Sequence, residues 1–312
     1  MSRLDLRHLD MLAAIEVSRT LADAAERLHI SPSAVTHRLR DAERRLGVRL
    51  FQRQGRHLRP TVAGQILAQA ALRIQADLEQ TERAAIATTA DITEIVRVSV
   101  AVYNAFHWLP GFMTYFRSVE PRIQIQVETL GSDTPYDNLA RHKVDVLLTP
   151  DTVIPASVDT VDLFADELVA VVPPNHAHAG REFLTGADFV SEIYLTYSLV
   201  KQPGFEADRV WATEGVMPLL EENIGSIEAA CELIKAGFGI SILSRWALKP
   251  QFEVGALVPV RVTSAGLDMT WRALVRSEAA PDAPERRMAA ALAEWFTRPN
   301  PACGVVESQT RP

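Results

Sequence analysis

The sequence predicts a small all-α head with a β-hairpin, joined by a long helix to a larger α/β part. Helical periodicity fills the first 46 residues, a second helical stripe begins after Thr61, and alternating strand and helix patterns begin near position 95. A chain of 312 residues also exceeds what one ordinary hydrophobic core accommodates. We therefore expect at least two domains of different fold class.

Charge is distributed unevenly along the chain, whose formal net charge is −7. Residues 1–60 contain twelve Arg and no Lys against seven acidic residues, so a basic head precedes an acidic remainder. Such a division favours a nucleic acid as the partner of the head. No apolar run long enough to span a membrane and no secretory signal pattern occurs, and Cys231 and Cys303 lack any metal-type spacing. These features predict a cytoplasmic protein.

Three helices are expected in the head, all before Gly47. The second starts at Thr20, which forms a capping pair with Asp23 three residues later. The third has Ser31 as its N-cap and Pro32 at its first position, and the glycine ends it. A short helix of small residues, a tight turn and a longer polar helix form the helix-turn-helix pattern of DNA-binding proteins. The alternative is an ordinary three-helix bundle.

A β-hairpin is expected after the third helix, with strands at Leu50–Phe51 and Leu58 on either side of Gly55. Its cations would lie along the DNA backbone or in the minor groove, while the first turns of the third helix would reach base edges in the major groove. The predicted DNA-binding residues are Ser31, Ser33, Thr36, His37 and Arg40 on the helix, and Arg53, Arg56 and Arg59 on the hairpin.

The long helix is expected from Val62 to about Thr89, with Thr61 as its cap. At 1.5 Å per residue it would be about 42 Å long. A narrow apolar stripe that includes Ile74 and Leu78 would stay uncovered on so long a helix. We expect it to pair with the same helix of a second copy, giving a homodimer or homotetramer that matches two DNA half-sites.

The remainder of the chain alternates strands with helices. The expected strands are 95–102, 123–128, 144–148, 163–172, 193–197, 237–243 and 269–275, and the expected helices are 108–118, 136–142, 226–236 and 285–296. Repeated strand–helix–strand units predict a parallel sheet with helices on both faces. The segment 299–312 is expected to be a loose tail.

A small-molecule ligand of such a sheet is expected beyond the carboxyl ends of the strands, where helix N-termini favour an anion. Polar residues at these places could instead be ordinary helix caps. The predicted effector-binding residues are Tyr103, Asn104, Thr149, Tyr197, Gly225 and Ser226.

No catalytic constellation is evident, so we expect no enzymatic activity. The common nucleophile, metal and phosphate-loop motifs are missing from the sequence, and the turn Gly237–Ser241 fails the dinucleotide spacing. His176 and His178 alternate in a loop, but no third ligand is near them in sequence, so we expect a solvated loop and no metal site. An enzyme and an exported two-lobed solute-binding protein are the alternative classes, and neither explains the arginine-rich head.

Residues 20–64 resemble the N-terminal signature of the LysR-type transcriptional regulators. The matching positions are Ala24, Ala25, Leu28, Ser31, Ser33, Ala34, Val35, Arg38, Leu39, Leu46, Gly47, Leu50, Phe51, Arg53 and Thr61 to Gly64. The sequence departs from the signature at Pro32–Ser33, where common members have Gln-Pro or Gln-Ser. More loosely, the resemblance extends over nearly the whole chain.

This resemblance implies a winged helix-turn-helix with a long linker helix, followed by a two-lobed effector domain like a periplasmic binding protein. The implied boundaries are 1–60 for the winged helix-turn-helix, 61–90 for the dimerisation helix and 91–298 for the effector domain, with lobe 1 at about 94–163 and 266–298 and lobe 2 at about 164–265. The implied partners are double-stranded DNA, RNA polymerase, a second copy of the chain and a small-molecule effector, with no membrane and no further cofactor. The protein would act as an activator.

Within this family, the chain is most similar to the regulators of methionine biosynthesis that respond to homocysteine. The runs that carry this similarity are Trp108–Leu109, Val144–Asp151, Phe164–Leu168 and Met269–Trp271. Those regulators have a His and thiols in the loop after the first strand, whereas the loop Val102–Ala105 contains no cysteine. A regulator of another metabolic pathway with a carboxylate effector is the alternative.

Overall fold

The computed structural model describes residues 3–18, 20–54, 57–87, 92, 94–101, 103, 105–129, 135–197 and 203–298. The chain divides into two compact units, one built on the segment up to position 93 and the other on Glu94–Leu139 and the chain from Val144 onward. None of the described helices is long and apolar enough to cross a membrane. The predicted tail at 299–312 lies outside the described residues.

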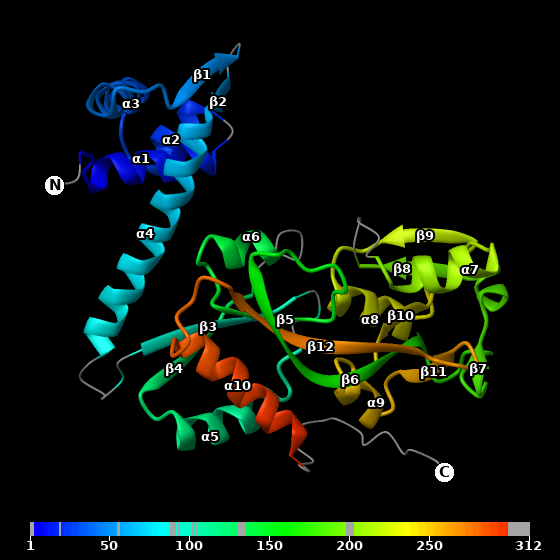
Figure 1. The fold of residues 1–312 in the computed structure, drawn as a ribbon. Coiled ribbons are helices and arrows are strands. Elements are labelled where there is room, and N and C mark those ends of the chain that lie inside the picture. The colour runs from blue at the N-terminus through cyan, green and yellow to red at the C-terminus, as the bar shows by residue number, and fades with distance from the viewer. Residues whose placement is uncertain are drawn as a thin grey trace. The chain divides into compact units, whose positions relative to one another are not determined.

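The first unit contains the predicted three helices, hairpin and long helix (Figure 1). They are α1 (Leu6–Glu16), α2 (Leu21–Arg27), α3 (Pro32–Leu46), β1 (Phe51–Gln54), β2 (His57–Pro60) and α4 (Val62–Ala87). The predicted caps are present, because the Thr20 hydroxyl accepts from the Asp23 N–H and the Ser31 hydroxyl from the Ala34 N–H, each at 3.2 Å. Gly47 ends α3 with a φ of 74°, a conformation that favours glycine.

The core of the first unit lies between α1, α3 and the start of α4. Val35 and Leu50 are completely buried there. Ala24 and Ala25 are also buried, and their small side chains let α2 approach the other helices closely. His29 makes the turn before α3 in the left-handed conformation, with a φ of 52°. The helix-turn-helix prediction is thus confirmed at the level of individual residues.

A buried polar contact that sequence reasoning missed joins α1 to α3. His8 is only 4% exposed. Its Nδ1 lies 2.8 Å from a carboxylate oxygen of Asp5, and its Nε2 lies 3.0 Å from one of Asp41. Hydrogen bonds from Arg44 and His8 lower the pKa of Asp41 to about 2, so this carboxylate stays ionised. The contact fixes α3 against α1.

The second unit combines a large mixed sheet with a short parallel pair of strands (Figure 1). Its strands are β3 (Glu94–Val100), β4 (Ile123–Val127), β5 (Val146–Thr149), β6 (Val158–Val172), β7 (Phe183–Leu184), β8 (Ile193–Thr196), β9 (Leu220–Asn223), β10 (Ser241–Ser244), β11 (Val258–Val262) and β12 (Leu267–Arg276). Its helices are α5 (Leu109–Val119), α6 (Pro135–Ala140), α7 (Ala212–Glu214), α8 (Ile227–Lys235), α9 (Lys249–Glu253) and α10 (Pro284–Thr297). Among the described residues the large sheet has the order β4-β3-β5-β12-β6-β11-β7, β10 also pairs with β6, and β8 pairs with β9.

The prediction of a parallel sheet is confirmed for β3, β4 and β5 and for the pairs β7–β11 and β8–β9, but the strands at the centre of the large sheet are antiparallel. β3 is parallel to β4 and β5, but β12 is antiparallel to both β5 and β6. β10 and β11 are also antiparallel to β6. The physical reason is that β6 and β12 are long strands that run through the unit in opposite directions (Figure 1). β6, with 15 residues, takes the chain away from β5, and β12 brings it back.

Helices cover both faces of the sheet around β3 and β5, as predicted. On one face, the Phe112 ring of α5 lies 5.7 Å from Trp108 and 5.8 Å from Trp295 of α10. On the other face, Leu139 of α6 packs in a separate cluster with Leu147 of β5. This packing buries β3 and β5 between helices.

Candidate DNA interface and effector site

The third helix has an exposed polar face opposite its buried residues. Ser33, His37 and Arg40 are exposed, whereas Val35 and Leu39 are buried in the core. Steps of four and three residues place the three polar side chains on one side of a helix. Arg40 pairs with no carboxylate in the part of the chain that the structure describes. Its guanidinium is therefore available to a phosphate or to a guanine edge.

Two further predicted residues of α3 have local hydrogen-bond partners. The Ser31 hydroxyl caps the helix and lies 2.8 Å from the Ser33 hydroxyl. The Thr36 hydroxyl donates to the Pro32 carbonyl oxygen at 3.0 Å. These bonds shape the first turn of the helix, and contact of Ser31 and Thr36 with DNA stays a prediction.

The hairpin prediction is confirmed, with β1 and β2 in antiparallel register and Arg59 opposite Gln52. Arg59 is exposed. Arg56 and the side chain of Arg53 lie outside the described residues. The described part of the hairpin thus presents one of the three predicted cations to solvent.

Four predicted effector-binding residues lie at the carboxyl ends of parallel strands. Thr149 ends β5 and Tyr103 follows β3, its parallel neighbour. Likewise, Tyr197 follows β8 and Gly225 follows β9, which are parallel to each other. Each pair therefore lies at the kind of edge where ligands of parallel sheets bind. Asn104 lies outside the described residues.

Tyr103 and Tyr197 bring these two edges together. Their ring centroids are 6.0 Å apart, and both side chains are buried. Tyr103 Oη accepts a hydrogen bond from the Ser244 N–H, at the end of β10, with a distance of 3.2 Å. The Tyr103 ring lies 5.7 Å from that of Trp271. Burial raises the pKa of both tyrosines above the ordinary value, so both phenols stay neutral hydrogen-bonding groups.

Thr149 and Ser226 have local roles instead. Thr149 is completely buried, and its Oγ1 accepts from the Asp151 N–H at 3.2 Å. Ser226 is half-buried and caps α8 by accepting from the Ala229 N–H at 3.3 Å. Gly225 precedes it with a φ of 72°. Contact with an effector stays a prediction for all of these residues, as it does for the tyrosines.

Asp166 on β6 is a polar centre that sequence reasoning missed. Its carboxylate accepts hydrogen bonds from Ser244 Oγ at 2.5 Å, Trp271 Nε1 at 3.0 Å and the Trp246 N–H at 3.0 Å. Burial raises the pKa of Asp166, and these hydrogen bonds partly offset the rise. Ser244 and Trp271 also contact Tyr103. Asp166 therefore helps to position the Tyr103 ring by holding these two neighbours in place. Its sequence signal was weak, because Asp166 is one of several acidic residues in β6.

Two family descriptions match the chain. The bacterial regulatory helix-turn-helix protein of the LysR family matches residues 6–65. The LysR substrate binding domain matches residues 90–297, more than half of the chain. The chain belongs to the LysR family of transcriptional regulators. Its fold is therefore the predicted one, a winged helix-turn-helix with a long helix and a two-lobed effector domain.

Several regulators are similar to this LysR protein. The HTH-type transcriptional regulators MetR of Salmonella typhimurium and Haemophilus influenzae are 28% and 26% identical to it over 273 and 275 residues. These alignments cover 88% of this chain, and 84% and 89% of the two relatives. The transcriptional activator protein LysR of Escherichia coli is 26% identical over 249 residues, with 78% of each chain covered.

Solved structures share the fold of this LysR protein. The LysR-family regulator CbnR, complexed with its target DNA, superposes with a TM-score of 0.64 at 18% identity, over 94% of this chain and 100% of that one. The regulatory domain of MetR from N. meningitidis superposes with a TM-score of 0.51 at 23% identity, over 64% of this chain and 92% of that one. At sequence identities of 18% and 23%, the similarity to these structures is evidence for the fold alone.

Proposed function

We propose that this LysR protein binds specific DNA sequences and regulates genes of methionine or sulfur amino-acid metabolism under the control of a small-molecule effector. The observation that carries DNA binding is the exposed polar face of α3, with Ser33, His37 and Arg40 on one side of the helix. The methionine assignment is supported by the similarity to two regulators named MetR.

Pairing of α4 with the same helix of a second copy gives the protein two DNA-binding heads. Ile66, Ile74 and Leu78 on α4 are 62%, 43% and 41% exposed. Covering this apolar stripe in a homodimer or homotetramer removes it from water, which is favourable. The two heads then bind half-sites that lie one helical turn, or a multiple of it, apart.

The effector binds between the lobes, beside Tyr103 and Tyr197. Its binding changes how the dimers associate, which alters the spacing of the heads and the bend of the DNA. The bend in turn changes the access of RNA polymerase, so the protein acts as a cytoplasmic activator without enzymatic activity. A carboxylate from another pathway is the second candidate effector, because Ser226 begins a helix whose N-terminus favours an anion.

Two arginine substitutions separate base recognition from phosphate binding. Arg40→Ala is expected to weaken binding to the specific site by about 10- to 100-fold, because a bidentate arginine–base contact is worth about 1–3 kcal/mol. Arg59→Ala is expected to weaken binding to all sequences and to reduce the slope of log affinity against log salt by about one. Fluorescence anisotropy with specific and random duplexes at several salt concentrations measures both effects.

The matched control is Arg117→Ala, which removes an exposed arginine of α5 and should leave both quantities unchanged. An unaltered salt slope in Arg59→Ala would remove Arg59 from the phosphate contacts. An Arg40→Ala protein with full sequence preference would remove Arg40 from the base contacts.

Titration calorimetry of the full chain with homocysteine, methionine and a panel of small carboxylates tests the effector. Saturable homocysteine binding supports the methionine assignment, and binding of a carboxylate alone moves the protein to another pathway. Tyr103→Phe is expected to weaken effector binding by about 2- to 10-fold, because one hydrogen bond is worth about 0.5–1.5 kcal/mol. Tyr115→Phe, at a half-buried position of α5, is the control. Equal affinities of Tyr103→Phe and the wild type would contradict the placement of the effector.

A further inference from the structure

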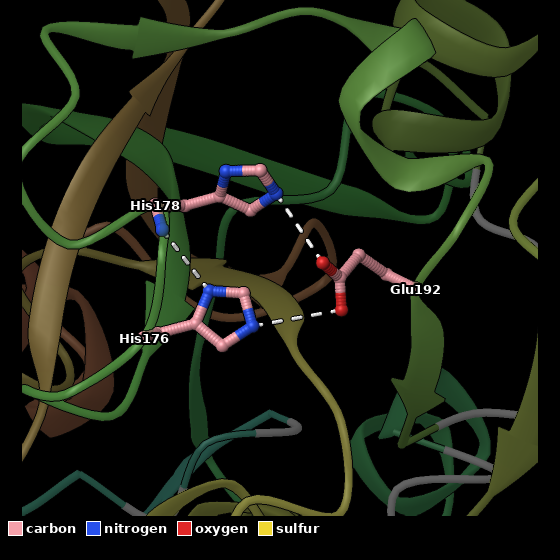
Figure 2. Close-up of side chains that lie close together, drawn as sticks. All are labelled: His176, His178 and Glu192. Atoms are coloured by element: carbon pink, nitrogen blue, oxygen red, sulfur yellow. Dashed lines mark hydrogen bonds and ion pairs between the residues drawn. The ribbon is translucent and has the colours of Figure 1, made fainter.

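Three metal-ligating side chains, none of them part of the tyrosine pair, meet in the second unit. His176 and His178 lie in the loop between β6 and β7, and Glu192 directly precedes β8. Figure 2 shows both imidazole rings turned toward the two oxygens of this one carboxylate. His176 Nε2 lies 3.6 Å from Glu192 Oε2, and His178 Nε2 lies 3.3 Å from Oε1. The sequence shows no third ligand beside the histidines, but the fold places one there.

The backbone holds the three residues in position before any ion binds. The Ala179 N–H donates to the His176 carbonyl oxygen at 3.0 Å, which closes a turn in the loop. The Glu192 N–H donates to the Phe189 carbonyl oxygen at 3.0 Å, and the Leu219 N–H donates to the Glu192 carbonyl oxygen at 3.1 Å. The backbone of these segments therefore has little conformational entropy left to lose when the side chains converge on an ion.

The distances and the donor set fit a transition-metal ion. Two ligands that each lie 2.0–2.1 Å from a tetrahedral Zn²⁺ are about 3.4 Å apart. The observed separations of 3.3 Å and 3.6 Å are close to this value, and all three ligand atoms lie within 4.8 Å of one another. Two imidazoles and one carboxylate suit Zn²⁺ and similar ions, whereas Mg²⁺ and Ca²⁺ prefer oxygen ligands alone.

One ligand atom is left unsatisfied by the protein. His178 Nε2 is buried, and it neither donates nor accepts a hydrogen bond within the part of the chain that the structure describes. Its 3.3 Å separation from Glu192 Oε1 is short enough for an ion pair but does not have the geometry of a hydrogen bond. The three side chains are between 14% and 22% exposed, so an ion can enter from solvent and keep a water molecule in its open position.

The hydrogen bond at Nδ1 of His176 shows which protonation of this ring must change when a metal ion binds at Nε2. Its Nδ1 accepts from the His178 N–H at 3.3 Å, so the neutral ring has its proton on Nε2. A metal ion takes the place of that proton, which moves to Nδ1, and the long hydrogen bond opens. The change is confined to one ring and one weak contact.

We propose that His176, His178 and Glu192 bind one divalent transition-metal ion, for which Zn²⁺ fits best. The bound ion links the loop after β6 to Glu192, the residue before β8. Because Tyr197 follows the same strand, the ion stabilises the strand from which one side of the tyrosine pair extends.

The test uses the full-length protein prepared without a polyhistidine tag. Titration with Co²⁺, whose visible absorption reports its coordination, should show one site per chain from which Zn²⁺ displaces it. His178→Ala and Glu192→Gln should each lower the Co²⁺ affinity by at least about 100-fold, because even second-shell partners of metal ligands are worth about 10- to 100-fold. His29→Asn is the control, since His29 is exposed and asparagine tolerates its φ of 52°.

A measurement on the wild type makes the test independent of how the variants fold. Bound Zn²⁺ should protect His176 and His178 from modification by diethyl pyrocarbonate and leave His29 reactive, as read by mass spectrometry of peptides. Any of three results overturns the proposal: no Co²⁺ site in the wild type, equal Co²⁺ affinity in a folded His178→Ala protein, or equal modification of the two histidines with and without Zn²⁺.

Discussion

Asp145→Ala is expected to lower the free energy of unfolding of the second unit by about 3–5 kcal/mol, because it removes the buried carboxylate that pairs with both Arg97 and Arg276. Asp145, Arg97 and Arg276 are only 2%, 4% and 7% exposed. The carboxylate accepts hydrogen bonds from Arg97 Nε and Nη2 at 2.9 Å and 3.0 Å, and from Arg276 Nη2 at 3.0 Å. Asp145, the residue before β5, thereby joins β3 to β12 within the large sheet.

Urea unfolding followed by tryptophan fluorescence measures this loss, since all five tryptophans of the sequence lie after Glu94. Asp162→Ala is the matched control. Asp162 also pairs with an arginine, with 2.7 Å between its carboxylate and Arg272 Nε, but its side chain is 70% exposed. Removal of an exposed pair should cost at most about 1 kcal/mol. Equal losses in the two variants would contradict the role assigned to burial.

Gly64→Ala is expected to destabilise the first unit by about 3 kcal/mol, the upper end of the usual cost of overpacking, because the added Cβ meets backbone and not a flexible side chain. A Cβ at this position would lie 2.0 Å from the Leu50 carbonyl oxygen. That oxygen already accepts from the Thr61 N–H at 2.9 Å and from its hydroxyl at 3.1 Å. The Thr61 hydroxyl in turn accepts from the Gly64 N–H at 3.1 Å, so a shift of the oxygen disturbs the start of α4.

Far-ultraviolet circular dichroism and DNA affinity report this change, while the tryptophan signal of the second unit should stay unchanged. Gly180→Ala is the control, because a Cβ there meets nothing within 4 Å. Its effect should stay within about 0.5 kcal/mol. If Gly64→Ala kept the wild-type unfolding transition and DNA affinity, the close approach of α4 to the hairpin would have no structural importance.

The first unit was predictable because its signals are local. The caps at Thr20 and Ser31 and the glycine that ends α3 act on residues three or four positions away. A hairpin likewise follows from its turn and its short flanking strands. His8 escaped prediction because its partner Asp41 is 33 positions away, on another helix.

The second unit was predictable as a set of strands but not as a sheet. Alternation of apolar residues at 163–172 indicates a strand, but it gives neither the true start at Val158 nor the direction of its neighbours. β9 was missed because all four of its residues are exposed, so no alternation marks it. Antiparallel partners of β6 follow from long-range pairing, which a local pattern does not record.

The residues of the candidate sites likewise divide into those with a local sequence signal and those that depend on long-range contacts. Tyr103 and Tyr197 were each predicted from a position after a strand, but only the fold shows that their rings meet. The carboxylates of Asp166 and Glu192 were missed because their partners come from segments far along the chain. Sequence reasoning finds residues that stand beside a recognisable element, and it loses those that act through distant contacts.

Selection from a pool of random-sequence DNA duplexes, at about 150 mM salt, tests sequence-specific binding by α3 most directly. The full-length protein should enrich a partly symmetric sequence whose halves lie about one helical turn, or a multiple of it, apart. The Arg40→Ala protein should retain DNA with a weaker preference. Retention of the pool without enrichment of any sequence, or no retention at all, would contradict the assignment of α3 as a recognition helix.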